Sequence, residues 1–356
     1  MKILVGLSGG VDSSVAAYLM KKAGHEVIGA TMSIWEKGRS FSHMTGGDGC
    51  FSPHEEEDIE SARKICEILD IPYRVVDCTA VYKQTVLENF KHEYMAGRTP
   101  NPCVWCNAKI KFQALPDAAK QQGIEFDKFA TGHYARVVLN EKTGFYNLLK
   151  GVDPKKDQSY FLYRLGQEQL ARVMLPLGDK TKSEIRQIAR EAGLPVSEKP
   201  DSQDFYTGDI NDILQAEPKR GDFVTRDGKV LGHHNGFWNY TVGQRKGLGI
   251  SAEKPLYVLG FDKEKNNVIV GFEDQNVCHG LTASSLNWTA GVPVTEPVSL
   301  MAKIRSSQQP TPVSVAPTGT DSISVEFENT QRGIAPGQSV VLYDGDLVVG
   351  GGLIRR

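Results

Sequence analysis

The sequence predicts an α/β fold, a doubly wound parallel sheet, followed by two small β-rich domains of which the last is a β-barrel. Three observations lead to this prediction. Apolar runs of strand length alternate with stretches of helical periodicity through the first part of the chain. A turn rich in glycine and serine directly follows the first apolar run. After about residue 207, short β-prone runs separated by turn residues replace the alternation.

The first part contains the strand and helix signals of a parallel sheet covered on both faces. Strands are expected at KILVGL, EVIGATM, YRVVD and KFATG, and helices over residues 12–24, 55–69, 80–96 and 108–122, with a cysteine loop before the last helix. A further helix is expected after Thr181, because Thr181 and Glu184 have the spacing of a capping box and Gly193 and Pro195 supply the stop.

The second part contains two hairpin signatures, DFVTRDGKVLG and VVLYDGDLVVGG, each with Asp-Gly between β-prone runs. Between them, VSLMAKIR, TPVSVA and SISVEFE alternate apolar and polar residues. We therefore expect three units: the α/β domain over residues 1–207, a small central β-rich domain over 208–275 and a C-terminal β-barrel over 276–356.

Composition excludes several classes of protein. The six cysteines among 356 residues are irregularly spaced, unlike the disulfide framework of a small secreted domain, so a reducing compartment is expected. The N-terminus lacks a signal-peptide core and no apolar run reaches the length of a membrane span. We expect a cytoplasmic protein with no membrane partner. The net charge of −2 does not by itself indicate a polyanionic partner.

The sharpest chemical signal is GLSGGVDSS at residues 6–14, between the first strand and the first helix. Gly9 and Gly10 allow backbone N–H groups to turn toward a ligand, and serine hydroxyls at a helix N-terminus favour an anion. The stretch lacks the Gly-Lys-Ser/Thr ending of a Walker A loop and is not a GxGxxG turn. The pattern predicts a phosphate-binding loop.

Several motifs resemble those of one family. SGGVDSS is similar to the pyrophosphatase loop (PP-loop) of N-type ATP pyrophosphatases, which have an adenine nucleotide alpha-hydrolase-like fold. AGRTPNPCVWCNAKIKF, ATGHYA, DPKKDQSYFLYRL, TVGQRKGLGI and APGQSVVLYDGDLVVGGG extend the similarity from residue 3 to about residue 354. Together these motifs resemble the tRNA-specific 2-thiouridylase (MnmA) family.

The resemblance implies the residues of an ATP site and a tRNA site. The implied ATP-binding residues are Gly6, Leu7, Ser8, Gly9, Gly10, Val11, Asp12, Ser13, Met32 and Gly132. The implied tRNA contacts are Asn101, Pro102, Cys103, His133, Lys156, Asp157, Gln158, Arg305, Ser306 and Gln338, the first three at the target base. Cys106 is implied as the catalytic nucleophile. The expected partners are the anticodon arm of a tRNA and a sulfur donor protein or sulfide, and the chain is expected to be a monomer.

The reaction implied by the resemblance is ATP-dependent 2-thiolation of the wobble uridine. The C2 carbonyl oxygen is a poor leaving group, so ATP first converts it to an adenylate, and sulfur then displaces AMP. Oriented N–H groups and Mg²⁺ would balance the phosphate charge. Asp12 is either a contributor to the metal site or a helix N-terminal acid that accepts free amides.

The sequence departs from the family at the second essential cysteine. Family members commonly carry that cysteine, which bears the persulfide, in a stretch resembling DSQ(D/E)ICF. Here the stretch is PDSQDFYTGD, and Tyr206 stands at the expected position. A phenol cannot carry a persulfide. The usual two-cysteine mechanism therefore requires another sulfur carrier in this chain.

Three interpretations of Cys103 and Cys106 follow. In the first, the pair is a thiol relay that both receives and delivers sulfur. In the second, the pair binds a 4Fe-4S cluster with Cys50 as the third ligand. In the third, the pair belongs to a structural zinc site, which ranks last because only one CxxC is present. The cluster is favoured over the relay, because the usual carrier is lost while a third loop cysteine is available. Cys66 and Cys78 are expected in the core.

Two other functions compete with tRNA thiolation. A ligase or amidotransferase could share the phosphate loop, but no glutaminase motif is visible. A tRNA-binding or sulfur-handling protein that has lost thiolation would explain Tyr206, but it would not need the intact phosphate loop and Cys106.

Overall fold

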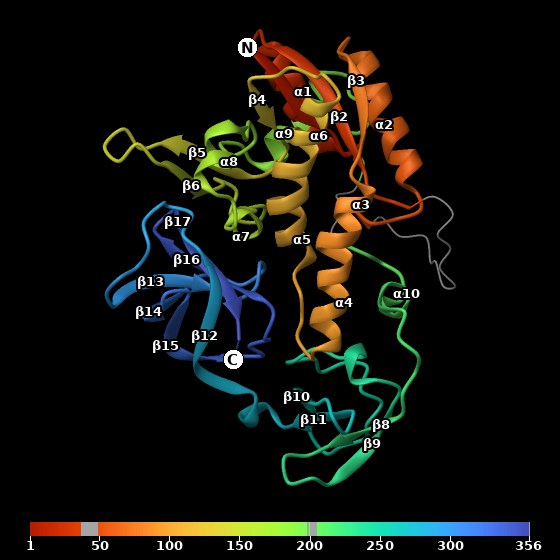
Figure 1. Ribbon diagram of the computed structural model, residues 1–356, viewed down its shortest axis with the longest axis vertical. Helices are drawn as coiled ribbons and strands as arrows, with labels where there is room; N and C mark the ends of the chain where they lie inside the picture. The colour runs from red at the N-terminus through yellow and green to blue at the C-terminus, as the bar shows by residue number, and fades with distance from the viewer. Residues whose placement is uncertain (37–48, 198, 200–204, 356) are drawn as a thin grey trace.

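The computed structural model describes residues 1–36, 49–197, 199 and 205–355. Five parallel strands form the first sheet in the order β3-β2-β1-β4-β7. Their bounds are β1 Lys2–Gly6, β2 Glu26–Ser33, β3 Tyr73–Asp77, β4 Lys128–Ala130 and β7 Val173–Met174. The sheet lies at the N-terminal end of an elongated molecule (Figure 1). The predicted parallel sheet is confirmed.

Helices cover both faces of this sheet. Ile3 and Val5 of β1 pack on one face with helices α1 (Val11–Lys22), α2 (Glu55–Ile68) and α9 (Lys182–Glu191). Leu4 points to the opposite face, because side chains alternate along a strand, and belongs to a second cluster. The second cluster includes residues of α3 Thr79–Tyr82, η1 Lys83–Leu87, α4 Glu88–Met95, α5 Pro102–Trp105, η2 Cys106–Ala114 and α6 Leu115–Gln121. Phe112 of η2 packs on Phe129 of β4, whereas α4 extends away from the sheet (Figure 1). The doubly wound arrangement is therefore confirmed.

The predicted cysteine loop is wrong, because the chain is already helical from Pro102 onward. Asn101 is the N-cap and its side-chain oxygen accepts a hydrogen bond from Val104 N at 3.3 Å, while Pro102 occupies the first helical position. Helices α5, η2 and α6 follow one another without a break, and η2 is a π-helix. Asn-Pro thus starts a helix here and does not form a turn before one.

The predicted helix after Thr181 is confirmed as α9. Thr181 and Glu184 form the capping box, with Thr181 N donating to Glu184 Oε2 at 2.7 Å. The short helices α7 Ser159–Leu162, α8 Gln167–Arg172 and α10 Ile210–Leu214 and the 3₁₀ turns η3 Phe237–Asn239 and η4 Glu273–Gln275 complete the helical elements of the described residues.

The second half forms two further sheets, as predicted. A four-stranded sheet has the order β10-β11-β8-β9, with β8 Gly221–Val224, β9 Val230–His234, β10 Tyr257–Asp262 and β11 Asn267–Gly271. The other comprises β12 Val277–Asn287, β13 Val298–Lys303, β14 Thr311–Gly319, β15 Ser322–Arg332, β16 Ser339–Asp344 and β17 Leu347–Ile354. Pairing of β12 with both β15 and β17 closes these six strands into the predicted barrel.

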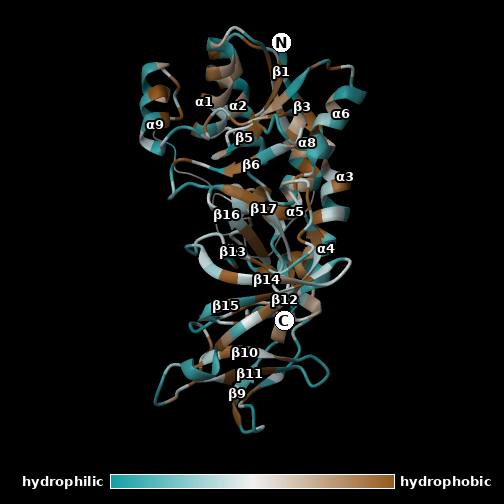
Figure 2. Cartoon of the chain, turned by 90° about the vertical axis from the view of Figure 1, so that its left-hand side faces the viewer, coloured by the Kyte–Doolittle hydropathy of each residue, from teal (hydrophilic) through white to brown (hydrophobic). Residues whose placement is uncertain are grey.

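A hairpin from the first part of the chain extends the barrel sheet. Strands β5 (Ala135–Leu139) and β6 (Tyr146–Lys150) pair with each other, and Leu149 of β6 pairs with Leu347 of β17. The largest hydrophobic cluster likewise combines all three parts, including Leu4, Phe223 and Tyr343. Figure 2 shows hydrophobic residues along β16 and β17, whereas the loops at the lower end of the molecule are largely hydrophilic. The predicted boundaries at residues 207 and 275 stay predictions.

No helix among the described residues is long and apolar enough to cross a membrane.

Candidate active site

The glycine- and serine-rich turn between β1 and α1 is closed by hydrogen bonds within itself. Ser13 Oγ accepts from Ser8 N at 3.1 Å and donates to Gly10 O at 3.2 Å, and Ser14 Oγ donates to Gly10 O at 2.8 Å. Gly9 has φ +69°, and a Cβ there would lie 2.6 Å from Asp58 O. The turn ends at the N-terminus of α1, where the backbone amides of the first helical turn favour an anion.

Two lysines that lie outside the sequence motifs flank this turn. Lys182 Nζ lies 2.7 Å from Asp12 Oδ1, which also accepts from Tyr134 Oη at 2.7 Å. Lys199 Nζ donates to Gly9 O at 3.3 Å and to Asp58 Oδ1 at 2.9 Å. The Asp12 carboxylate therefore has two side-chain partners inside the protein, a lysine and a tyrosine. Neither is a backbone amide of α1, so both predicted roles of Asp12 stay predictions.

The other predicted nucleotide residues lie at the same edge of the sheet. Met32 is near the carboxyl end of β2, and Gly132 follows the carboxyl end of β4. A Cβ on Gly132 would lie 2.6 Å from the Asp12 carbonyl carbon and 2.7 Å from Ser13 N. In an open parallel sheet, ligands bind outside the carboxyl ends of the strands. The predicted set thus converges on the expected edge.

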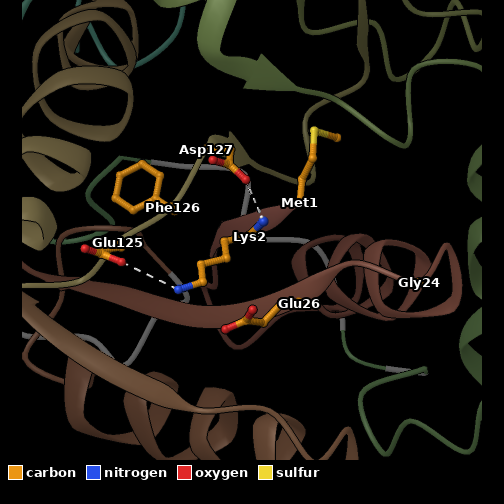
Figure 3. A pocket seen from close by; sticks show the side chains of 7 residues that line it. All are labelled: Met1, Lys2, Gly24, Glu26, Glu125, Phe126 and Asp127. Atoms are coloured by element: carbon orange, nitrogen blue, oxygen red, sulfur yellow. Dashed lines mark hydrogen bonds and ion pairs between the residues drawn. The ribbon is translucent and has the colours of Figure 1, made fainter.

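A surface hollow of about 620 Å³ lies at the opposite edge of the sheet (Figure 3). Its lining includes Lys2 and Glu26 at the amino ends of β1 and β2, together with Asp127 just before β4. Lys2 N donates to Asp127 Oδ2 at 2.8 Å, and Lys2 Nζ lies 3.6 Å from Glu125. This hollow is therefore separate from the phosphate loop.

The two cysteines of the CxxC pair have different environments. Cys103 is partly exposed on α5, whereas Cys106, the first residue of η2, is 8% exposed. Burial raises the pKa of the Cys106 thiol to about 12, and the Lys111 ammonium opposes that rise. Lys111 is on the same π-helix five residues later, and i→i+5 hydrogen bonding places such residues one turn apart on one face. The Lys111 ammonium is thus close enough to the Cys106 thiol to favour its thiolate form.

The segment of the third candidate cysteine, Cys50, lies beside the segment of Tyr206. A Cβ on Gly49 would lie 3.3 Å from Tyr206 Cα, and Phe51 N donates to Phe205 O at 2.9 Å. Cys50 is exposed between these two contacts. Tyr206 itself donates to Asp212 Oδ2 at 2.8 Å, whereas residues 201–204 lie outside the described part of the chain. The segment around Cys50 and the segment of Tyr206 are therefore neighbours.

Cys50, Cys103 and Cys106 share an electrostatic neighbourhood. All three act on the pKa of Lys111, which burial lowers and the three sulfurs raise. Even so, the described residues contain no group of three or more His, Cys, Asp or Glu side chains arranged to hold a metal ion. Cys66 and Cys78 are 1% and 3% exposed within the hydrophobic clusters, which confirms their predicted place in the core.

His133 lies between the phosphate loop side and the cysteine helix. Its Nδ1 is 2.8 Å from Thr131 Oγ1, and its ring centroid is 5.4 Å from that of Phe112 on η2. Burial, followed by the Lys111 charge, lowers the pKa of His133 to about 3. The imidazole is therefore neutral at physiological pH and would act as a hydrogen-bonding group.

The remaining predicted tRNA residues are spread over two junctions between domains. Asp157 accepts from Gly151 N and Ser159 N, each at 3.1 Å, and lies 3.9 Å from Lys303 of the barrel. Gln158 Oε1 accepts from Tyr134 N at 2.9 Å, and Lys156 lies in the same turn. Gln338 contacts the residues just before Asn101.

Arg305 and Ser306 are exposed at the second junction, where Arg305 Nη2 donates to Gly333 O at 2.6 Å, close to Gly243 of the small β domain. These two residues therefore lie apart from the others, on the side of the barrel that faces the small domain.

A parallel sheet with a glycine- and serine-rich phosphate loop at its carboxyl edge, and a cysteine pair on a helix beside it, defines a PP-loop type α/β protein with a thiol site. Three family models match: "tRNA methyl transferase HUP domain" over residues 1–206, "tRNA methyl transferase PRC-barrel domain" over 210–272 and "Aminomethyltransferase beta-barrel domain" over 278–354.

Full-length relatives give the particular family. The chain is 50% identical over 356 residues to the tRNA-specific 2-thiouridylase MnmA of Endomicrobium trichonymphae, covering 99% of both proteins. It is 46% identical to the MnmA of Geotalea uraniireducens, covering all of this chain and 95% of the relative. The chain belongs to the tRNA-specific 2-thiouridylase MnmA family.

Two solved structures resemble part of the chain. A 4-thiouridine synthetase in complex with RNA and ATP gives a TM-score of 0.34 at 18% identity, covering 57% of this chain and 44% of that protein. NMN synthetase from Francisella tularensis gives 0.32 at 17% identity, covering 56% and 65%.

Proposed function

We propose that this chain catalyses ATP-dependent 2-thiolation of the wobble uridine of tRNA. The observation that carries the proposal is the combination, in one α/β domain, of a phosphate loop and a nearby cysteine pair on a helix. ATP adenylates the C2 carbonyl oxygen and releases pyrophosphate; sulfur then attacks C2 and AMP leaves with the oxygen. The anticodon arm of the tRNA is the proposed partner.

The ATP site is proposed at the carboxyl edge of the first sheet. The backbone of residues 6–13 and the N-terminus of α1 would hold the phosphates, with Met32 near the base and Gly132 lining the nucleotide. Lys182 and Lys199 add positive charge on either side of the loop.

Mg²⁺ is proposed to enter with the phosphates of ATP. The two carboxylates nearest the loop, Asp12 and Asp58, each have a lysine partner at 2.7–2.9 Å. Because Mg²⁺ at such sites is held largely by phosphate oxygens and water, it does not require an all-protein site.

Sulfur is proposed to travel through a relay of Cys103 and Cys106. Cys103 is the more exposed thiol and would receive the persulfide from a sulfur donor protein or from sulfide and an oxidant. The outer sulfur of the persulfide forms the bond to C2 as AMP leaves. Cys106 then attacks the inner sulfur, which breaks the sulfur–sulfur bond and leaves a Cys103–Cys106 disulfide that an external thiol must reduce.

The predicted 4Fe-4S cluster does not fit the donor arrangement as it stands. A cluster needs three thiolates around one centre, and no such group is present in the described ranges. We derive no step through a cluster. Anaerobic iron and sulfide analysis of the wild-type protein and of the Cys50→Ala variant tests the alternative directly, since a bound cluster would give iron that the variant loses.

The activity is tested with purified protein, ATP, a small-molecule persulfide donor, a thiol reductant and an unmodified tRNA transcript. We expect 2-thiouridine in nucleoside mass spectra and pyrophosphate exchange into ATP that depends on tRNA. A protein that only binds tRNA would give neither, and a ligase of another kind would exchange pyrophosphate without tRNA. Nucleosides from a strain lacking the gene should lose the 2-thiouridine derivative.

A further inference from the structure

A turn of the C-terminal barrel contacts the chain immediately before the cysteine helix. The contact is made by residues 336–339, which are the turn before β16 and the first residue of that strand, and these residues pack on residues 98–100. Thr99 N donates to Pro336 O at 2.7 Å, and Gln338 Nε2 donates to Thr99 O at 3.1 Å and to Pro100 O at 3.0 Å. Both hydrogens of the Gln338 amide nitrogen are therefore used inside the protein.

The two backbones approach each other too closely for a side chain at Gly337. This glycine has φ +90°, and a Cβ on it would lie 2.9 Å from Thr99 O and 3.0 Å from Arg98 Cβ. A contact of this kind fixes the position of the segment before Asn101, because neither backbone can shift toward the other.

A buried tyrosine joins the same turn to the helix cap. Tyr160 is fully buried, and its hydroxyl donates to Ser339 O at 2.9 Å. Burial raises the pKa of Tyr160, and the side chain of Asn101 is among the neighbours that oppose the rise, so Asn101 lies beside this hydroxyl. Asn101 is the N-cap of α5 and holds Val104 N. The barrel, Tyr160 and the start of the cysteine helix thus form one connected arrangement.

We propose that Gln338 and Tyr160 are positioning residues that fix the start of the cysteine helix, so that docking of the C-terminal barrel sets the place of Cys103 and Cys106. This role differs from the tRNA contact that the family resemblance implies for Gln338, because the donor side of its amide faces the protein. The kinetic part of the proposal rests on the proposed thiolation activity, whereas the structural part does not.

The test uses the full-length variants Gln338→Glu, Gln338→Leu and Tyr160→Phe. Gln338→Glu places carboxylate oxygens against two carbonyl oxygens, and Gln338→Leu removes the donors without adding charge. Gln331→Glu is the matched control, because Gln331 is another barrel glutamine whose amide donates to Asn329 O, away from the cysteine helix.

Hydrogen exchange of the peptide spanning residues 98–107 is measured on the protein alone. We expect at least tenfold faster exchange in this peptide for both Gln338 variants, a smaller increase for Tyr160→Phe and none for Gln331→Glu. In single-turnover thiolation at saturating tRNA, the rate should fall by a similar factor. If one Gln338 variant lost protection from exchange throughout the first sheet, that variant would be unfolded. The exchange of residues 98–107 in the other Gln338 variant would then test the proposal.

Unchanged exchange in residues 98–107, together with weaker tRNA binding, would overturn the proposal and leave Gln338 as a tRNA contact. If the wild-type protein gave no thiolation, the exchange result would still decide the positioning role, so the two proposals fail in different measurements.

Discussion

The phosphate loop and the cysteine helix lie in the same domain but are held by different kinds of contact. The hydrogen bonds that close the phosphate loop join residues three to five positions apart, such as Ser8 with Ser13. The start of the cysteine helix is held by Gln338, which is 238 and 239 positions away from Pro100 and Thr99. One site is formed largely by its own sequence, and the other depends on the barrel.

This difference has a physical reason. A strand-to-helix turn can satisfy its polar groups with nearby serines, so it needs little from the rest of the chain. Thr99 and Pro100, by contrast, have their backbone partners on the barrel, at Pro336 and Gln338. We therefore expect substitutions to separate the two sites: some should damage nucleotide binding alone, and others should damage sulfur transfer alone.

The largest expected effect is that of Cys106→Ser, which should lower thiolation by about 10³-fold or more, because no neighbouring thiolate then cleaves the sulfur–sulfur bond that joins Cys103 to the base. ATP affinity, measured by calorimetry, should be unchanged, because the loop is closed locally. Cys278→Ser is the control, since Cys278 is exposed on β12. Full thiolation by the Cys106 variant in nucleoside mass spectra would exclude the relay.

The next largest effects are expected from two glycine substitutions, one of which should weaken ATP binding while the other should slow thiolation. Gly132→Ala pushes a Cβ into the backbone of Asp12 and Ser13, so ATP affinity should fall at least about tenfold, or about 1.4 kcal/mol. Gly337→Ala should leave ATP affinity within twofold and slow thiolation instead.

Gly24→Ala is the control for the backbone effect. Gly24 also has a left-handed φ of +82°, but nothing lies within 4 Å of the added Cβ. Its stability should fall by about 1 kcal/mol in denaturant unfolding with both activities retained. Equal loss of ATP affinity in the Gly132 and Gly337 variants would contradict the separation of the two sites.

A smaller effect is expected at Lys111. The thiolate is the reactive form, and the raised pKa of Cys106, to about 12, means that alkylation by iodoacetamide should keep rising with pH through pH 10. Lys111→Met removes the charge that opposes this rise, so labelling of the Cys106 peptide at pH 9 should slow a few-fold. Lys109→Met, on the exposed face of the same helix, should have no effect. Equal rates in both variants would remove Lys111 from the thiol site.

The smallest effect is expected at the ion pair of Glu93 and Arg98, whose arginine directly precedes Thr99. Two hydrogen bonds of 2.6 and 2.7 Å join the side chains. Burial raises the pKa of Glu93, and Arg98 more than offsets this, so the pKa is lowered. The pair therefore stabilises the fold above the pKa of an unfolded glutamate, near 4.3, and this contribution is lost as pH falls through the lowered native pKa.

Glu93→Gln should lower the free energy of unfolding by about 1–2 kcal/mol at pH 7, with the difference from wild type shrinking below about pH 4. Glu88→Gln, at an exposed position of the same helix, should have little effect. A difference that is constant from pH 3 to pH 7 would argue against an ionic contribution.

Much of the fold could be predicted from local patterns. The capping box of Thr181 and Glu184 and the alternation that buries Ile3 and Leu4 on opposite faces are short-range signals. The cysteine helix was predicted to start too late, because Asn-Pro is compatible with both a turn and an N-cap, and only the bond to Val104 N decides between them. The hairpin of β5 and β6 was missed because its place is set by pairing with β17.

The sequence by itself determined the parallel sheet, the phosphate loop, the two β-rich domains and the family, because these rest on periodicity, turn chemistry and motifs that are local in the chain. Only the tertiary structure placed Lys111 beside Cys106, Cys50 beside the segment of Tyr206, and Tyr160 and Gln338 at the start of the cysteine helix. Lys111 and Cys106 are neighbours because η2 is a π-helix, and the segments of Cys50 and Tyr206 meet within the first part of the chain. Tyr160 and Gln338 hold the start of the cysteine helix only once the barrel packs against the α/β domain.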